Sequence, residues 1–191
     1  MVYCIYNKNQ GDKPLRDEIQ KILISEEEIQ NTVKRLAEQV NKDYGDQELV
    51  LLIILKGSIV FGADLMRYLT GPVSLDFMQV SSYGNSSVSG ELKILKDSQH
   101  DLSGKKVLIA EDIIDSGNTL KALIELLKGR GCDVEICTLL SKPARREVEI
   151  DVKYCGIEIP DEFVVGYGLD YAEKFRNLPY IGILKKEVYS N

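Results

Sequence analysis

With 191 residues, of which 44% are hydrophobic and 28% charged, the chain is long enough for one globular domain with a substantial core. A net charge of −6 argues against a nucleic-acid partner that binds through bulk electrostatics. No apolar run approaches the ~20 residues that span a bilayer, and residues 1–10 lack a signal-peptide pattern, so we expect a cytoplasmic protein without a membrane partner.

The first part of the chain predicts an arm and a packing helix. Residues 1–21 mix polar and charged groups with a turn signal at 11–14, and we expect an N-terminal arm there. Ser25 and Glu28 have the spacing of a capping box, in which the serine caps the helix and the glutamate reaches back. Apolar residues then recur at helical spacing until Gly45, which predicts an amphipathic helix between these signals.

A strand and a polar turn follow. Residues 48–55 form a near-continuous apolar run, as expected for a strand that is covered on both faces. The run stops at Lys56-Gly57-Ser58, and a helical pattern begins after it. Lys56 is either a solvated turn residue or an anion-binding group, and the pattern alone leaves both interpretations open.

The next segment predicts a long hairpin. Residues 73–80 and 91–96 have strand patterns, and the polar residues 81–90 between them have little to bury. Such a tip is either a passive turn or a mobile lid, and we expect it to be flexible.

Residues 106–120 are the stretch around which the chain is organised. An apolar run ends in two carboxylates, Glu111 and Asp112, and a short polar loop starts at Asp115 before an amphipathic helix. This pattern predicts a strand–loop–helix unit whose loop lies at the carboxyl end of a parallel strand, where open α/β sheets bind ligands. A phosphate site is expected at the helix start, from Ser116, Gly117, Asn118 and Thr119.

The acidic residues of this stretch need partners of opposite charge. Three carboxylates beside a phosphate site would repel the ligand if nothing else were bound. A divalent metal or ligand hydroxyl groups are therefore the expected partners of Glu111, Asp112 and Asp115.

Two further strands are predicted towards the C-terminus. Residues 133–140 form one, and it leads to Lys142, which is either a surface charge or a ligand contact. Phe163 is either a core residue or a ring that stacks on a base. Residues 179–184 predict the final strand.

The polar loop resembles a known signature. Residues 111–117, Glu-Asp-Ile-Ile-Asp-Ser-Gly, are similar to the motif with which type I phosphoribosyltransferases bind phosphoribosyl pyrophosphate (PRPP). Within that family, the form of the motif looks like that of the hypoxanthine-guanine phosphoribosyltransferases. The resemblance covers residues 22–188 and implies one α/β domain over residues 1–191. Its fold would be a parallel-sheet core flanked by helices, with a small hood and a flexible hairpin loop.

The resemblance also implies an activity, which belongs to purine salvage. The 5-phosphoribosyl group of PRPP would be transferred to N9 of hypoxanthine or guanine, giving IMP or GMP and pyrophosphate. Mg²⁺ is the implied cofactor, with Glu111, Asp112 and Asp170 as candidate ligands. We expect a homo-oligomer, either a dimer or a tetramer.

Roles for the phosphate-binding residues follow from the same resemblance. Asp115 matches the general acid/base near N7 of the purine, and the loop from Asp115 to Thr119 binds PRPP together with Glu111 and Asp112. The Leu55–Lys56 peptide in such enzymes can be cis. The pyrophosphate ligands would be Lys56, Gly57 and Arg176.

The resemblance further assigns a purine site and a lid. In this family a lysine at the position of Lys142 donates to the six-position oxygen, and the ring at Phe163 stacks on the purine. Val164 would contact the base through its backbone, and Asp170 lies in the same segment. The tip of the lid that closes over PRPP would be Ser82-Tyr83. Glu162 stands where some members have lysine, which leaves the preference among bases open.

Three other interpretations remain at this point. One is a phosphoribosyltransferase for xanthine or adenine. Another is a non-catalytic regulator that binds PRPP, although the acidic chain lacks a basic extension and a DNA-binding motif. The last is a plain nucleotide-binding structural domain, which leaves the Lys56 loop and residues 170–176 unexplained.

Overall fold

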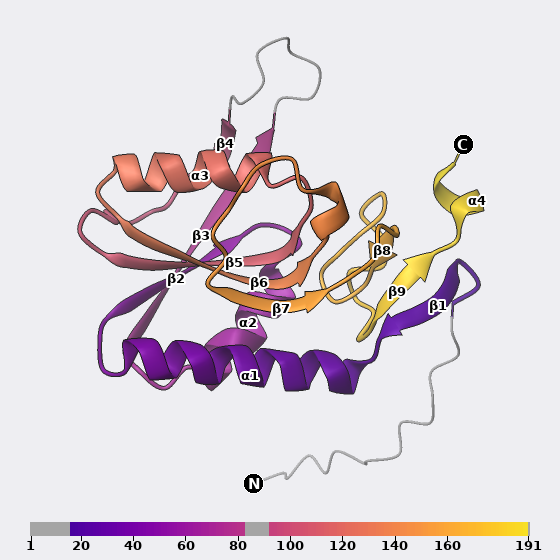
Figure 1. Ribbon diagram of the computed structural model, residues 1–191, viewed down its shortest axis with the longest axis horizontal. Coiled ribbons are helices and arrows are strands. Elements are labelled where there is room, and N and C mark those ends of the chain that lie inside the picture. The colour runs from indigo at the N-terminus through magenta and orange to yellow at the C-terminus, as the bar shows by residue number, and fades with distance from the viewer. Residues whose placement is uncertain (1–15, 83–91, 191) are drawn as a thin grey trace, which may run out of the picture.

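The computed structural model describes residues 16–82 and 92–190, which form two β-sheets and the helices packed on them (Figure 1). The larger sheet comprises β2 (Leu49–Ile54), β3 (Val73–Ser82), β4 (Leu92–Lys96), β5 (Lys106–Ile114), β6 (Asp133–Ser141) and β7 (Tyr154–Glu158). Their order across the sheet is β4-β3-β2-β5-β6-β7. The neighbours from β3 to β7 pair in parallel, and β4 pairs with β3 in the antiparallel direction. The predicted parallel-sheet core is confirmed.

Helices cover both faces of this sheet. Helices α1 (Glu26–Tyr44) and α2 (Ile59–Tyr68) lie on one face, and α3 (Asn118–Gly129) lies on the other (Figure 1). Short helical turns η1 (Pro143–Arg145) and α4 (Lys186–Tyr189) complete the helical elements of the described residues. None of the helices in this part of the chain has the length and apolar character needed to cross a bilayer.

The residues of the central strand β2 pack against the hydrophobic cores on both faces of the sheet. All its residues are buried, and they alternate between two hydrophobic cores. Leu51 and Ile53 pack in the core under α1 and α2, whereas Val50 and Leu52 pack in the core under α3. Because successive side chains of a strand point to opposite faces, a sheet covered on both sides requires an apolar residue at every position. The continuous apolar run at 48–55 was therefore interpreted correctly.

The predicted capping box at the start of α1 is confirmed. The Glu28 backbone N–H donates to Ser25 Oγ at 3.3 Å, and the Ser25 N–H donates to Glu28 Oε2 at 2.8 Å. These two bonds satisfy backbone donors that a helix start otherwise leaves unpaired. The helix ends before Gly45, whose φ of +53° favours glycine.

A small antiparallel sheet forms the hood beside the main sheet (Figure 1). Its strands are β1 (Ile19–Ile24), β8 (Val164–Val165) and β9 (Ile181–Leu184), in the order β1-β9-β8. We predicted an N-terminal arm over residues 1–21. For residues 19–21 this prediction is wrong, because Ile19 begins β1 and pairs with Leu184 of β9. The short strand has no clear alternation in its sequence, and only the distant partner β9 organises it. The remainder of the predicted arm, residues 1–15, lies outside the described residues.

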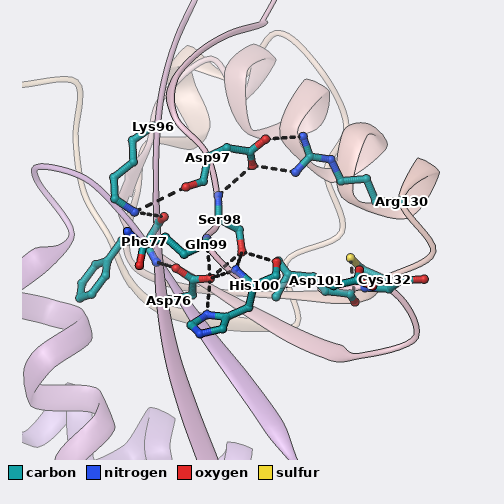
Figure 2. A network of polar contacts seen from close by, with 12 residues as sticks. Asp76, Phe77, Lys96, Asp97, Ser98, Gln99, His100, Asp101, Arg130 and Cys132 are labelled. Carbon is teal, nitrogen blue, oxygen red and sulfur yellow. Dashed lines mark hydrogen bonds and ion pairs between the residues drawn. The ribbon is translucent and has the colours of Figure 1, made fainter.

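The hairpin β3–β4 is confirmed up to its tip. Ser82 pairs with Leu92, and most of the predicted flexible segment, 83–90, lies outside the described residues. The chain after β4 is fastened to β3 by the buried carboxylate of Asp76 (Figure 2). Its Oδ2 accepts hydrogen bonds from Ser98 Oγ at 2.5 Å and from the His100 N–H at 3.3 Å. These contacts fix the segment that connects the hairpin to β5.

Candidate active site

The carboxylate pair lies inside β5 rather than after it. The apolar run predicted a strand that ends before Glu111, but β5 continues to Ile114 because β6 pairs with it as far as Ile114↔Ser141. The extension carries Asp112 alongside the turn that follows β2. The Asp112 N–H donates to Ser58 Oγ at 3.1 Å, and a methyl group at Gly57 would overlap the Asp112 carboxylate. The two predicted loops therefore meet at the carboxyl ends of neighbouring parallel strands.

Burial gives both carboxylates unusual proton affinities. It raises the pKa of Glu111 well above its ordinary value, and the neighbouring charge of Asp112 adds to the rise. Burial also raises the pKa of Asp112 to about 6, although the Ile113 N–H and the Arg176 charge act in the opposite direction. Within the described residues, Glu111 Oε2 is buried without a hydrogen-bond partner. Such a group favours a bound cation or a ligand hydroxyl as its partner.

The carboxylate oxygens at the carboxyl end of β5 suit an Mg²⁺ ion that takes some of its ligands from the substrate. The described residues contain no group of three or more acidic, histidine or cysteine side chains placed to hold a metal by themselves. Mg²⁺ in phosphate-transfer sites commonly uses one or two carboxylates, substrate phosphates and water. The unpartnered oxygen of Glu111 fits that requirement. Asp170 is engaged, since its Oδ1 lies 2.9 Å from Arg176 Nη2 and its Oδ2 accepts the Glu173 N–H.

The two cations predicted to bind pyrophosphate, Lys56 and Arg176, contact the same carboxylate, that of Glu173. The Leu55–Lys56 peptide is cis, as the resemblance implied, and Lys56 Nζ lies 3.0 Å from Glu173 Oε1. Arg176 Nη2 lies 3.4 Å from Glu173 Oε2, and its Nη1 donates to the Gly168 carbonyl at 2.7 Å. The structure thus brings together two cations that are far apart in the sequence. It also adds Glu173, for which no sequence signal was found.

In the loop predicted to bind phosphate, a glycine directly precedes helix α3. Gly117 has φ +87° and directly precedes the helix, whose first N–H groups have no intrahelical partners. The side chain of Asn118 is not free for a phosphate, because its Nδ2 donates to Glu147 Oε2 at 2.6 Å. The Glu147 N–H in turn donates to the Ser116 carbonyl at 3.0 Å. The Asn118 N–H donates to Ser116 Oγ at 3.4 Å, so both the side chain and the backbone N–H of this residue have partners within the described residues.

Residues 146–150, which follow η1, pack against Gly117 of this loop, and no pattern in the sequence predicted that contact. A Cβ at Gly117 would lie 2.7 Å from Ile150 Cδ1 and 3.3 Å from Arg146 Nη1. Arg146 Nη2 donates to Ser141 Oγ at 2.8 Å and to the Ile114 carbonyl at 3.4 Å. The arginine thereby ties the ends of β5 and β6 together behind the loop. Adjacent arginines without a partner in the local sequence gave no signal of this arrangement.

A buried lysine lies beside the predicted acid/base. Lys142 Nζ is 3.5 Å from Asp115 Oδ1, and Arg145 Nη1 is 3.8 Å from Asp115 Oδ2. Within the described residues, Asp115 Oδ1 has no hydrogen bond despite its burial. A buried ammonium group with one long contact has unused donors, and burial is unfavourable unless such groups are paired. This pair can accept a ligand that offers both an acceptor and a donor.

The predicted purine segment provides an aromatic ring and a free strand edge. Phe163 is 36% exposed, stacks on Tyr189 with 4.9 Å between ring centroids, and meets Tyr171 edge-on at 5.6 Å. The Leu184 N–H donates to the Phe163 carbonyl, and Val164 pairs with Ile183. Bonding alternates along an antiparallel pair, so the N–H and C=O of Val164 point away from β9. They are directed outward at the edge of the hood sheet.

The predicted lid residues are only partly described. Ser82 is the last residue of β3, and Tyr83 lies outside the described residues. The remaining predicted site residues come from the carboxyl ends of β2, β5 and β6 and from the segment that begins at Phe163. This is the edge at which open parallel sheets bind ligands.

Comparisons with known proteins agree with this arrangement. Residues 20–172 match the family described as the phosphoribosyl transferase domain. The chain is 51% identical over 179 residues to a hypoxanthine-guanine phosphoribosyltransferase of Staphylococcus aureus, covering 93% of this chain and 100% of that protein. A crystal structure of a hypoxanthine phosphoribosyltransferase from S. aureus superimposes with a TM-score of 0.88 at 52% identity, covering 91% of this chain and 96% of that one.

A longer relative contains a similar region. The chain is 50% identical over 182 residues to a protein of Listeria monocytogenes (serotype 4b) named bifunctional protein TilS/HprT. The match covers 94% of this chain but 28% of that protein. The chain thus spans somewhat more than a quarter of the length of this relative.

Proposed function

The chain belongs to the phosphoribosyl transferase family and, within it, to the hypoxanthine-guanine phosphoribosyltransferases, and we propose that it converts hypoxanthine or guanine to the nucleoside monophosphate for purine salvage. The phosphoribosyl group of PRPP is transferred to N9 of the base, and pyrophosphate leaves. The observation that carries this proposal is the buried Lys142 ammonium beside Asp115. An ammonium group only donates hydrogen bonds, so it suits the six-position oxygen of a 6-oxopurine.

In this proposal, two residues stabilise the pyrophosphate leaving group. They are Lys56, in the turn after β2, and Arg176. Departure of pyrophosphate leaves positive charge on the ribose, as in the oxocarbenium-like transition state of glycosidases. Lys56 and Arg176 both contact the Glu173 carboxylate in the free protein, and the negative charge that develops on pyrophosphate would be stabilised by the same two cations. Glu111, Asp112 and Asp170 would hold Mg²⁺, which neutralises phosphate charge when it is bound.

Proton transfer is assigned to Asp115. A carboxylate near N7 of the base accepts the proton of that nitrogen as N9 attacks the ribose, which makes the purine a better nucleophile. The contact of Asp115 with Lys142 at 3.5 Å keeps a positive charge next to the carboxylate. Because that lysine also donates to the six-position oxygen, the two residues together orient the base for attack by N9.

The base is placed between the hood and the phosphate loop in this proposal. The ring of Phe163 stacks on the purine, and the outward N–H and C=O of Val164 contact its edge. Ser116 to Thr119 bind the phosphate of the ribose 5-position through backbone N–H groups at the start of α3. The Ser82-Tyr83 segment would close over PRPP and keep water from the ribosyl cation.

One assay tests the proposal against its alternatives. Pyrophosphate release is measured with PRPP, Mg²⁺ and one base at a time, using hypoxanthine, guanine, xanthine and adenine, and the nucleotide product is identified by chromatography. Turnover with hypoxanthine or guanine supports the proposal, and a clear preference for xanthine assigns the chain to xanthine. Binding of PRPP without turnover for any base would contradict catalysis and favour a PRPP-binding regulator.

Two further properties belong to the same proposal. We expect a homo-oligomer, a dimer or a tetramer, which light scattering after size-exclusion chromatography determines directly. We also expect the protein to work in the cytoplasm, in line with free thiols at the described cysteines Cys132, Cys137 and Cys155.

A further inference from the structure

A carboxylate bridges the two cations assigned to pyrophosphate. Glu173 Oε1 lies 3.0 Å from Lys56 Nζ, and Glu173 Oε2 lies 3.4 Å from Arg176 Nη2. Each oxygen thus contacts one of the two cations. A glutamate side chain is anionic at neutral pH, so the bridge consists of one negative charge between two positive ones. The arrangement resembles that of a phosphate ligand with two oxygens on two cations.

The backbone at Glu173 is unusual for a glutamate. Tyr171 and Lys174 exchange backbone hydrogen bonds at 3.2 and 3.0 Å, which makes the two residues between them a tight hairpin turn. Ala172 and Glu173 have φ values of +50° and +62°. A two-residue turn with both central φ values positive favours glycine, asparagine or aspartate, because a longer side chain is strained in that conformation. A glutamate at this position is therefore better explained by a function of its carboxylate than by the turn.

The carboxylate does not hold Arg176 in place. Arg176 keeps two other contacts, with Asp170 Oδ1 at 2.9 Å and with the Gly168 carbonyl at 2.7 Å. The Glu173 and Lys56 side chains are 67% and 54% exposed, so their ion pair is weak and exchanges readily in water. A stronger anion can therefore take the place of Glu173 without disturbing the guanidinium group. These contacts are better explained by a Glu173 carboxylate that competes with the ligand for Lys56 and Arg176 than by one that positions the two cations for it.

We propose that Glu173 is an internal anion that occupies Lys56 and Arg176 in the free protein and is displaced when pyrophosphate, or the pyrophosphoryl group of PRPP, binds. The inference rests on the proposed function, because it takes Lys56 and Arg176 as the pyrophosphate ligands. Pyrophosphate carries several negative charges and displaces a single carboxylate, whereas weaker anions compete less well. Glu173 thereby disfavours inorganic phosphate at the empty site and eases the departure of pyrophosphate after the reaction.

The test compares ligand affinities of charge-matched variants. Isothermal titration calorimetry measures magnesium pyrophosphate, inorganic phosphate and GMP binding to the wild type, Glu173→Gln and Glu38→Gln. Glutamine preserves the length of the side chain and removes its charge. Glu38→Gln removes the same charge from an exposed position on α1.

Glu173→Gln should bind pyrophosphate and phosphate roughly two- to tenfold more tightly at low ionic strength, with less gain at high salt. GMP affinity and all Glu38→Gln affinities should stay within about twofold of the wild type.

Each result decides the matter. Unchanged or weaker pyrophosphate binding by Glu173→Gln overturns the inference, and weaker binding would assign Glu173 a positioning role instead. Lys56→Ala provides the second arm: it should weaken pyrophosphate binding, and the gain from Glu173→Gln should shrink in that background. If Lys56→Ala binds pyrophosphate as tightly as the wild type, Lys56 is not a pyrophosphate ligand. That result would contradict both this part of the proposed function and the inference about Glu173. If Lys56→Ala weakens binding but Glu173→Gln does not tighten it, the Glu173 inference alone is wrong.

Discussion

Lys142 Nζ lies 3.5 Å from Asp115 Oδ1, and the pairing of two parallel strands determines this contact. Ile114 at the end of β5 is paired with Ser141 at the end of β6, so the next residue of each strand is Asp115 and Lys142. The residues proposed as acid/base and as base-reading cation therefore lie side by side at the sheet edge. The predictions for these two residues follow from that register.

Asp115→Asn should lower kcat by roughly 10²–10⁴ and leave PRPP affinity within a few fold, since the amide keeps the shape of the side chain and loses proton transfer. Steady-state kinetics and PRPP titration measure the two quantities. Asp161→Asn is a suitable control, because Asp161 shares the Arg145 contact with Asp115 but has no contact with Lys142 among the described ion pairs. The control should retain kcat within a few fold. Full turnover by Asp115→Asn would remove Asp115 from the mechanism.

The choice of base should depend on Lys142. The ammonium group can donate to the oxygen of hypoxanthine or guanine, but adenine presents an amino group, which is another donor. Sites built around such a hydrogen bond can reject the mismatched analogue by about 10⁴ or more in kcat/KM. We expect discrimination of that order against adenine, and a large loss of 6-oxopurine activity in Lys142→Ala. Lys121→Ala, which removes an exposed lysine of α3, should change neither. Comparable kcat/KM values for adenine and hypoxanthine in the wild type would refute the assignment.

Gly57→Ala should impair PRPP use without a general loss of folding. The added methyl group would overlap the Asp112 carboxylate, so the turn after β2 or the carboxylate must move. We expect kcat/KM for PRPP to fall by at least about tenfold, because such displacements at a reacting site are costly. Gly129→Ala at the end of α3 is the matched control, since its methyl group would meet nothing within 4 Å. Similar kinetics for the two variants would show that the close approach of Gly57 and Asp112 is not required.

Acid should destabilise the protein partly through Asp76. Burial raises the pKa of this carboxyl group, but hydrogen bonds from Ser98, the Phe77 N–H and His100 outweigh it and lower the pKa to about 2, from an ordinary 3.8. Since the pKa is depressed on folding, the stabilisation is complete above pH ~4 and is lost as the pH falls towards 2. The shift corresponds to roughly 2 kcal/mol of unfolding free energy at neutral pH.

Urea unfolding of the wild type and Asp76→Asn across this range measures the effect. The variant should be less stable at pH 7, and the difference in unfolding free energy should shrink between pH 4 and pH 2. Asp46→Asn, at an exposed turn position after α1, should remain within about 0.5 kcal/mol of the wild type. A difference between the wild type and Asp76→Asn that stays constant with pH would show that hydrogen bonding to the charged carboxylate is not its source.

Local patterns determined the elements whose signals lie within a few residues. The capping box at Ser25, the apolar run of β2 and the strand–loop–helix unit around Asp115 were all predicted, because backbone propensity and periodic burial act along the chain. The cis Leu55–Lys56 peptide was implied by resemblance to a family and is present. These features placed the candidate site at one edge of a parallel sheet.

Only the tertiary structure decided the contacts between segments far apart in the sequence. Strand β1 depends on pairing with β9, the extension of β5 past Glu111 depends on β6, and the position of Ile150 over Gly117 depends on a distant turn. The bridge that Glu173 makes between Lys56 and Arg176 is of the same kind. Each of these contacts depends on packing or strand pairing between elements that are remote in the sequence. Such interactions override local propensity. A short stretch of sequence therefore could not predict these contacts.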